Sequence, residues 1–435
     1  MTGASAAAVA AIDTERLFAT CAAIVDVPSP TGRERACAER IVDLLDAAGL
    51  DGRLLPLDDL AANAWARLPA AGPRAGDGPT LLLYAPIDTL TTGAVDDDVP
   101  QVGETVEGHL LPRARRTGDV VTGLGAHNPK GHAACIVEAV AAIAASGVEL
   151  AGDVVVGFGA GGMPTFAVDD PDDPLQRANT GHGVGASFLL ERGVWPDAAV
   201  IAKSGWFVQH EEVGLAWSDI VVGGTHTYVG ARHRLPYRNA IADAARVVLH
   251  LEAAFAGAER SSPTLSPQAM VAEIDGGWRR MAAFLPASVR LRVDQRILPS
   301  ESPLDAHRRL EQLLDELRAD DPHLDIRAEL ILAISGTVTA RDHWVCAAGR
   351  RAWEATTGEA HTDPTGLSGS TDANILRGRG VPTMRIGLPK VHVDGTELGF
   401  AEGMNTVDVA ALTALTEVLV RTTVDVCSRP RSELR

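Results

Sequence analysis

Short apolar runs alternate with amphipathic stretches along the first part of the chain. Continuous apolar runs lie at 80–88, 153–159 and 197–205. They predict buried strands, because a strand covered on both faces carries apolar residues at nearly every position. Apolar residues recur at helical spacing at 34–48 and 132–147, which predicts helices. Strands that alternate with helices indicate a mainly parallel sheet with helices on both faces.

The pattern changes near residue 215. The stretches "AWSDIVVGG" at 216–224 and "SVRLRVDQRIL" at 288–298 alternate apolar and polar residues, which is typical of strands with one face in water. Helical spacing predicts helices at about 240–256 and 303–319. This part is therefore expected to be an α+β insert with an antiparallel sheet.

The α/β pattern returns after about residue 333, with a helix near 344–356, a strand at 382–388 and a closing helix from about 407. We therefore predict an α/β domain built from 1–213 and 333–435, interrupted by an α+β domain at 214–332.

Composition narrows the classes of partner. The formal net charge is -18. Proteins that bind nucleic acids or anionic membranes usually carry a basic surface, so such partners are not expected here. Five scattered cysteines without a C-x-x-C pair are typical of free thiols in a reducing compartment. No positively charged leader and no run of about 18 apolar residues is present. We expect a cytoplasmic protein whose partner is a small molecule, with the acidic stretch 168–174 as a solvated loop.

A series of motifs, in order along nearly the whole chain, resembles one group of enzymes. The motifs are "VPSPTGRE" (27–34), "LLLYAPIDT" (81–89), "GLGAHNPKGHAA" (123–134), "PDAAVIAKSG" (196–205), "VVGGTHTYVG" (221–230), "PYRNAI" (236–241) and "SGSTDANIL" (368–376). Together they resemble the zinc aminoacylase/carboxypeptidase family, which includes acetylornithine deacetylase and succinyl-diaminopimelate desuccinylase. The resemblance implies a catalytic α/β domain, an inserted dimerisation or lid domain, a homodimer, and hydrolysis of an amide bond with two zinc ions.

The positions that match the family's zinc ligands carry other residues. Pro86 stands where the resemblance implies a His, Asn128 where it implies the bridging Asp, and Lys203 where it implies a carboxylate. The stretch 159–164, "GAGGMP", lacks the implied Glu-Glu pair, and no His occurs around Ala401. A Lys nitrogen about 4 Å from Zn²⁺ would be repelled by roughly 8 kcal/mol at an effective dielectric constant near 20. We therefore expect no metal at the family's position.

Asp88 and Lys203 remain as charged residues in this pocket, and we hypothesise that they form an ion pair there. The alternative is that each makes unrelated contacts. His127 and His132 flank Asn128, and a relocated metal site with Asp88 is a further, less favoured alternative, because a spacing of five is not a helical ligand spacing.

Other candidate residues follow from the resemblance. His226 matches a His that reaches the partner subunit's site and stabilises the oxyanion, and Asn239 matches an Asn that holds the substrate. Arg238 belongs to a local basic patch that suits a carboxylate; the alternative is a loop paired with neighbouring acids. Gly369, Ser370 and Thr371 form a turn whose N–H groups suit a ligand carboxylate, or simply cap the next helix.

Three functional hypotheses follow. The first is an amidohydrolase that acts without metal on an amide or ureido C–N bond of a small carboxylate-bearing molecule, with Asp88, Asn128, Lys203 and His226 in the site. The second is a non-catalytic pseudoenzyme that binds a carboxylated ligand. The third is a zinc-dependent deacylase with relocated ligands. No complete Ser or Cys nucleophile set replaces the metal, since Ser204 and Lys203 are adjacent on a strand and point to opposite faces.

Overall fold

The chain is divided into two compact units in the computed structural model, which describes residues 3–102, 105–106, 108–166, 181–257, 262–393 and 395–434. Unit 1 comprises Met1–His210, Thr339–Asp363 and Thr371–Arg435, and unit 2 comprises Glu211–Val338 and Pro364–Ser370. The segments 211–213, 333–338 and 364–370, which the sequence analysis assigned to the α/β domain, thus lie in unit 2. The acidic stretch 168–174 lies outside the described residues.

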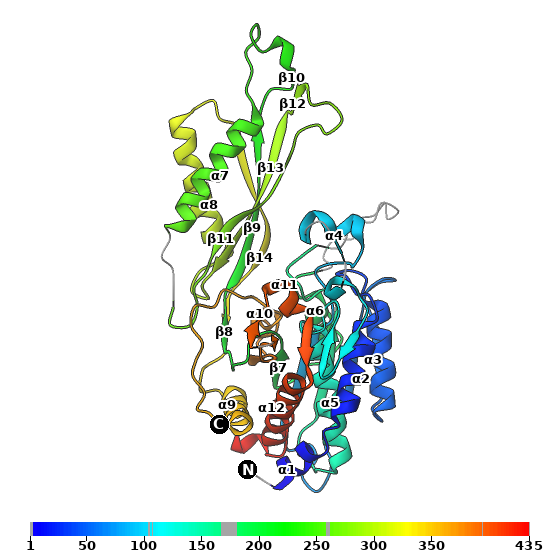
Figure 1. Cartoon of the computed structure of the whole chain (residues 1–435). Helices are drawn as coiled ribbons and strands as arrows, with labels where there is room; N and C mark the ends of the chain where they lie inside the picture. The colour runs from blue at the N-terminus through cyan, green and yellow to red at the C-terminus, as the bar shows by residue number, and fades with distance from the viewer. Residues whose placement is uncertain are drawn as a thin grey trace. The chain divides into compact units, whose positions relative to one another are not determined.

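Unit 1 is built on a 6-stranded sheet in the order β1-β2-β6-β3-β7-β16 (Figure 1). The four strands β6 (Val154–Gly159), β3 (Leu81–Pro86), β7 (Ala198–Ala202) and β16 (Thr383–Ile386) are parallel. The strands β1 (Arg53–Pro56) and β2 (Ala62–Leu68) complete one side in antiparallel pairing. The predicted mainly parallel sheet is therefore confirmed.

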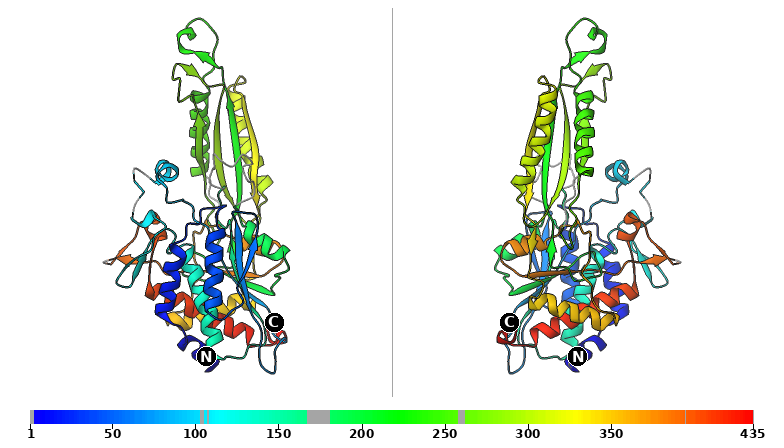
Figure 2. Two further views of the ribbon diagram at one scale, coloured as in Figure 1. Left: turned by 90° about the vertical axis from the view of Figure 1, so that its right-hand side faces the viewer. Right: turned by 90° about the vertical axis from the view of Figure 1, so that its left-hand side faces the viewer.

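Helices cover both faces of this sheet, as the views in Figure 2 show. Leu81 and Leu83 of β3 pack in the core formed with α2 (Thr14–Val25), α5 (Lys130–Ser146), α9 (Trp344–Thr357) and α12 (Val409–Cys427). Leu82 and Tyr84 point to the opposite face, where α6 (Val184–Glu191) and α10 (Ala373–Gly378) lie. Every residue of β3 is buried, which is why this strand reads as one continuous apolar run.

The strand order places the polar segments of interest together. β6 follows β3 in sequence and pairs on one side of it, whereas β7 pairs on the other side. In open α/β sheets, ligands bind beyond the carboxyl ends of the strands at such a switch point. The segments after β3, β6, β7 and β16 therefore meet at the carboxyl edge of the sheet.

Unit 2 contains a 4-stranded antiparallel sheet in the order β11-β13-β9-β14. Its strands are β9 (Gly214–Gly223), β11 (Ala269–Gly276), β13 (Ser288–Ile297) and β14 (Ile326–Ile334). The helices α7 (Ala240–Ala256) and α8 (Pro303–Asp320) bury one face of this sheet (Figure 1). The opposite face carries the ion pairs of Asp219 with Arg290 and Arg292. The predicted α+β insert is confirmed.

The described residues contain further α-helices and strands. They are α1 (Gly3–Ala10), α3 (Arg35–Ala47), α4 (Val95–Val102), α11 (Phe400–Met404), β4 (Arg115–Thr117), β5 (Val120–Thr122), β8 (Glu211–Glu212), β10 (Thr227–Tyr228), β12 (Phe284–Leu285), β15 (Thr337–Val338), β17 (His392–Val393), β18 (Thr396–Glu397) and β19 (Thr406–Asp408). All five cysteines are buried free thiols. Among the helices described, none combines the length and apolarity needed to cross a bilayer.

Candidate functional site

The candidate site lies at the carboxyl edge of the sheet in unit 1. Asp88 follows β3, the segment Gly161–Met163 follows β6, and Lys203 follows β7. His127 and Asn128 precede α5 and contact two further segments at this edge, through Pro389 after β16 and Met404 at the end of α11. Segments far apart in the sequence are thus joined here by direct hydrogen bonds.

Asp88 is fully buried and its carboxylate is held by protein donors. Oδ1 accepts the N–H of Gly162 at 2.9 Å, and Oδ2 accepts the N–H of Met163 at 2.9 Å. Oδ2 also accepts the hydroxyl of Thr31 at 2.7 Å. Consecutive backbone N–H groups of this kind form a concave anion-binding nest.

The hypothesis that Asp88 and Lys203 form an ion pair is wrong. Within the described residues, the Asp88 carboxylate and the Lys203 ammonium group bind other partners and make no ion pair with each other. The physical reason is that three donors already satisfy the Asp88 carboxylate. Lys203 instead extends to the other side of the same segment, where its Nζ lies 3.4 Å from the carbonyl oxygen of Gly162 and 3.7 Å from Sδ of Met163.

Two of the replaced ligand positions pack against each other. A Cβ on Gly162 would collide with the Cβ of Pro86 and would lie 2.8 Å from Oδ2 of Asp372. Residue 162 therefore has to be Gly in this arrangement, and a carboxylate side chain there has no room. The Pro86 ring packs directly against Gly162 and occupies the space beside it.

Glu34 is a second buried carboxyl group at the same segment. Its Oε1 accepts the N–H groups of Gly32 at 2.8 Å and Gly161 at 2.9 Å, whereas Oε2 is buried with no hydrogen-bond partner. Burial, together with the negative charge of Asp88, raises the pKa of Glu34 to about 8. Glu34 is therefore largely protonated at neutral pH, so the pair carries one negative charge rather than two.

His132 is held as a neutral imidazole of defined tautomer. Its Nε2 accepts the backbone N–H of Leu388 at 3.2 Å, so its proton resides on Nδ1. Burial lowers the pKa of His132 well below its usual range, and the neighbouring His127 and Lys203 lower it further. Nδ1 is buried and makes no hydrogen bond of normal geometry.

His127 has the opposite tautomer. Its Nε2 lies 3.1 Å from the carbonyl oxygen of Pro389, an acceptor, so Nε2 carries the proton and donates. Burial lowers the pKa of His127 below its usual 6.5, which keeps the ring neutral at pH 7. Nδ1 is therefore a basic lone pair, and it is buried with no partner. The rings of His127 and His132 lie edge to face with centroids 5.5 Å apart.

Asn128 adds a further acceptor. Its Nδ2 donates to Sδ of Met404 at 3.3 Å, while its Oδ1 is buried without a partner. An unpaired buried polar atom costs about 1–3 kcal/mol, and such atoms rarely gather without a ligand or water between them. We define His127, Asn128, His132 and Lys203 as the polar quartet of the carboxyl edge.

The polar quartet does not fit a pair of zinc ions. Zinc in proteins takes thiolate, imidazole or carboxylate ligands. Within the described ranges, no group of three or more His, Cys, Asp or Glu side chains is arranged to hold a metal ion. The Asp88 oxygens and both Nε2 atoms of the His pair are already engaged, and the Lys203 ammonium group adds a repelling charge. The relocated site of His127, His132 and Asp88 therefore has no support in this geometry.

The candidate residues of unit 2 have structural partners. Arg238 forms ion pairs with Asp243 and Asp321 at 2.5 and 2.6 Å. It is therefore paired with neighbouring acids, as the alternative interpretation held, and is not free to bind a ligand carboxylate. The Oδ1 atom of Asn239 caps α7 by accepting the N–H of Ile241 at 3.1 Å. His226 is exposed, stacks on Phe284, and its Nδ1 lies 3.0 Å from the carbonyl oxygen of Leu285.

The turn of Gly369, Ser370 and Thr371 is divided between the two units, because unit 2 ends at Ser370 and unit 1 resumes at Thr371. Oγ1 of Thr371 accepts the N–H of Ala373 at 3.2 Å, where α10 begins. Thr371 therefore caps the start of α10, as the alternative interpretation of this turn held. With only six residues, α10 offers no strong terminal anion site.

Three residues of the site were missed or undervalued in the sequence. Glu34 was visible only as part of the motif at 27–34, and His127 and His132 were weighed as ligands of a less favoured relocated metal site and not as catalytic residues. The run "AHNPKGH" did carry a signal, since it places four polar side chains in an otherwise apolar stretch. The tautomers of His127 and His132 depend on backbone groups of residues 389 and 388, which lie far away in the sequence.

Comparison with known proteins shows which fold this is. No protein-family model matches the chain. Similar structures include the di-peptidase Dug1p of Saccharomyces cerevisiae (TM-score 0.71, 14% identity, 99% of this chain and 100% of that chain). An M20 family metallo-carboxypeptidase of Sulfolobus solfataricus has a TM-score of 0.65 at 13% identity over 93% and 98% of the two chains. A hydantoinase/carbamoylase-family amidase of Burkholderia vietnamiensis has 0.64 at 18% over 96% and 98%. At these identities the likeness shows the fold, and it confirms the fold that the motifs implied.

The pKa of Glu34 generates a prediction about stability. Between pH 4.5, its ordinary pKa, and about 8, the folded chain keeps a proton that the unfolded chain loses. The free energy of unfolding therefore falls as pH rises through this window. Glu34→Gln removes this dependence. In urea unfolding, the difference in the free energy of unfolding, variant minus wild type, should therefore increase by about 3 kcal/mol between pH 5.5 and 8.5.

The matched control is Glu39→Gln on α3, where the side chain is 54% exposed beside Arg35. It should follow the wild-type pH dependence. A Glu34→Gln variant whose stability tracks that of the wild type at every pH would contradict the buried, protonated carboxyl group.

Proposed function

We propose that this chain is an amidohydrolase that cleaves an amide or ureido C–N bond of a small carboxylate-bearing molecule without zinc. The observation that carries the proposal is the polar quartet, in which two buried acceptors and a donor lack partners beside an ammonium group. A ligand with both N–H and C=O groups complements this set. The substrate class follows from the sequence resemblance, and the expected location is the cytoplasm.

The fold supports a reaction at a C–N bond. Structures that share it over nearly their whole length are described as a di-peptidase, a metallo-carboxypeptidase and a hydantoinase/carbamoylase-family amidase. The same edge of the same sheet is where ligands bind in open α/β folds. The chain keeps this scaffold while the residues around Asp88 differ from a metal-binding set.

The residues divide the work of hydrolysis as follows. Nδ1 of His127 accepts a proton from water as the water oxygen attacks the carbonyl carbon of the substrate. The Lys203 ammonium group stabilises the negative charge that forms on the carbonyl oxygen. Asn128 accepts a hydrogen bond from the substrate N–H. His127 then returns its proton to the leaving nitrogen as the C–N bond breaks, which yields an acid and an amine.

Burial suits this chemistry. Lys203 is 6% exposed, and Asn128 and His127 are each 7% exposed. A charge held in such a low-dielectric environment acts more strongly on a reacting group than it does in water. Asp88 and Glu34 serve a positioning role, because they fix the segment Gly161–Met163 against which Lys203 lies.

The first test measures activity with and without metal. N-acyl and N-carbamoyl amino acids are screened with the purified protein in the presence of a strong chelator, and its zinc content is measured. We expect turnover to persist in chelator and to fall by about 10²–10³ in Lys203→Met, which removes the ammonium group but keeps the chain length. Lys390→Met, at a lysine that is 72% exposed, is the control and should retain activity.

The alternatives correspond to distinct outcomes of this test. Activity that vanishes in chelator and returns with zinc would support the zinc-dependent deacylase and overturn the proposal. Binding of several compounds, detected as raised thermal stability, without turnover of any would support a pseudoenzyme that holds a carboxylated ligand.

The role of His127 predicts a pH profile. Because the base acts in its neutral form, kcat/KM should rise with pH through the pKa of His127, which burial holds below its ordinary value, and then level off. His127→Asn should lower kcat by about 10²–10⁴ and abolish this acid limb. The exposed His323 provides the control variant His323→Asn, which should keep both the rate and the limb. An unchanged limb in His127→Asn would exclude His127 as the base.

A homodimer through unit 2 is the assembly we propose. The ring of Tyr228, 50% exposed, and that of Trp278, 43% exposed, both contact Phe284, and His226 stacks on the same ring. An exposed aromatic cluster of this kind is typical of a protein interface. In such a dimer, His226 would serve the partner subunit's site, as the resemblance implies.

Complementation tests this assembly. Chains carrying His226→Ala and chains carrying Lys203→Met should each be inactive alone. If His226 acts across the interface, co-expressed chains form mixed dimers with one intact site, so about a quarter of wild-type activity should return. No recovery in mixed dimers verified by mass would contradict a role for His226 in the partner subunit.

A further inference from the structure

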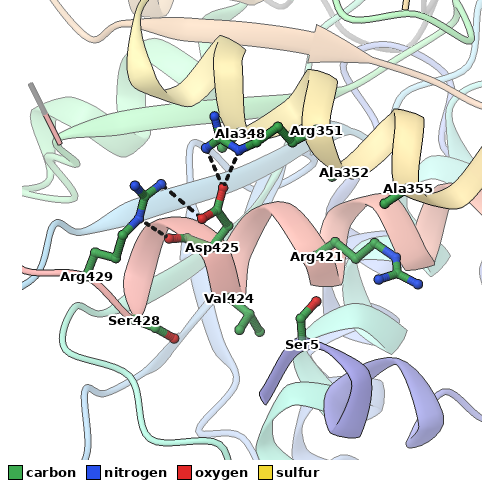
Figure 3. A pocket seen from close by; sticks show the side chains of 10 residues that line it. All are labelled: Ser5, Ala348, Arg351, Ala352, Ala355, Arg421, Val424, Asp425, Ser428 and Arg429. Atoms are coloured by element: carbon green, nitrogen blue, oxygen red, sulfur yellow. Dashed lines mark hydrogen bonds and ion pairs between the residues drawn. The ribbon is translucent and has the colours of Figure 1, made fainter. Parts of the chain in front are cut away.

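A separate cavity lies between the helices α1, α9 and α12 of unit 1 (Figure 3). Its volume is about 480 Å³. This is within the range of about 300–1,000 Å³ that is common for small-molecule sites. No residue of the candidate site belongs to its lining.

The cavity lies toward the opposite edge of the sheet. The carbonyl oxygen of Cys427, next to the lining residue Ser428, accepts the N–H groups of Ala151 and Gly152 at 2.7 and 2.9 Å. One residue, Asp153, separates these two residues from the amino end of β6. Six residues of extended strand, about 20 Å, separate them from the segment that contacts Asp88. The cavity is thus independent of the proposed reaction.

Small side chains create the space and make one wall apolar. Ala348, Ala352 and Ala355 lie in a row along α9 (Figure 3), and Val424 of α12 adds a further apolar side chain to the lining. Larger side chains at these helical positions would close the gap between the two helices. The wall accommodates the hydrocarbon part of a ligand.

The rim is positively charged although the protein is acidic. Three guanidinium groups, of Arg351, Arg421 and Arg429, and one carboxylate, Asp425, belong to the lining, so its formal charge is 3 − 1 = +2. Glu417, outside the lining, pairs with Arg421 and lowers the local sum to +1. Over the whole chain the formal net charge is -18. The cavity therefore attracts anions on a surface that mostly repels them.

Asp425 orients two of these arginines. Arg351 donates to Oδ2 of Asp425 from Nε at 3.2 Å and from Nη2 at 2.5 Å. Arg429 approaches Oδ1 from the other side at 3.0 Å and donates from Nε to the backbone oxygen of the same residue at 2.8 Å, as Figure 3 shows. Within the described chain, Nη1 of Arg351 and Nη1 of Arg429 make no hydrogen bond. Asp425 thus orients two guanidinium groups that keep donors to spare for an anion.

One further polar atom in the lining lacks a partner. Oγ of Ser428 is buried and makes no hydrogen bond. Such an atom is normally paired with water or a ligand. It lies one residue from Arg429 and three from Asp425 on the same helix end.

We propose that this cavity binds a small organic anion, with a carboxylate or phosphate group against Arg351 and Arg429 and an apolar body along α9. The head group explains the oriented guanidinium groups, and the body explains the alanine wall. The ligand and the site are distinct from those of the proposed hydrolysis.

The test is calorimetric titration of the full chain with octanoate, octyl phosphate, octylamine and inorganic phosphate. At least one of the two octyl anions should bind about tenfold or more tightly than both octylamine and inorganic phosphate, because only the octyl anions combine a negative charge with an apolar body. Which octyl anion binds more tightly identifies the preferred head group.

Two variants locate the binding. Arg351→Gln combined with Arg429→Gln should weaken the octyl anions about tenfold or more. Ala355→Phe, at an exposed position, should block the cavity without disturbing the core. Arg379→Gln removes a surface arginine paired with Glu191 on the other face and should change nothing. Octylamine binding as tightly as the anions, or affinities unchanged in both cavity variants, would overturn the proposal.

Discussion

The nest formed by the backbone N–H groups of Gly161, Gly162 and Met163 determines what the carboxyl edge of this sheet can do. These groups bind the two buried carboxyl groups Glu34 and Asp88, and the Pro86 ring packs against Gly162 where a Cβ would collide. A segment that binds carboxyl groups through its backbone has no side chains to offer a metal ion. It also leaves Asp88 without any need for a cationic partner.

Lys203 acquires its role from this arrangement. Since Asp88 is satisfied, the ammonium group has only weak contacts, 3.4 Å to the Gly162 carbonyl oxygen and 3.7 Å to Sδ of Met163. It stays close enough to His132 to depress the pKa of that ring, which helps keep the imidazole neutral. Residues Leu388 and Pro389 then define the tautomers of His132 and His127. A positive charge, a basic lone pair and an amide acceptor result, without a metal ion among them.

Pattern alone predicted most of the fold, because buried strands and amphipathic helices leave strong local signals. The helix expected at 240–256 is α7 with the same bounds, and the fully buried β3 lies within the run at 80–88. The candidate site was less predictable. The ion pair of Asp88 with Lys203 was wrong because backbone donors, which sequence does not reveal, compete for the carboxylate. The sequence predicted that Arg238 and Asn239 bind a ligand. In the structure Arg238 pairs with Asp321 and Asn239 caps α7. The cavity beside Arg351 was not foreseen, since it requires three helices to meet.

The central claim is that the space beside Asp88 is filled by Pro86 and a backbone nest and holds no pair of metal ions. Anomalous diffraction at the zinc absorption edge, from crystals grown with excess zinc, tests it most directly. The account predicts no anomalous peak within coordination distance of Asp88, Asn128 or Lys203, and a Met163 N–H still bound to Asp88. Two well-occupied zinc peaks beside these residues would contradict it.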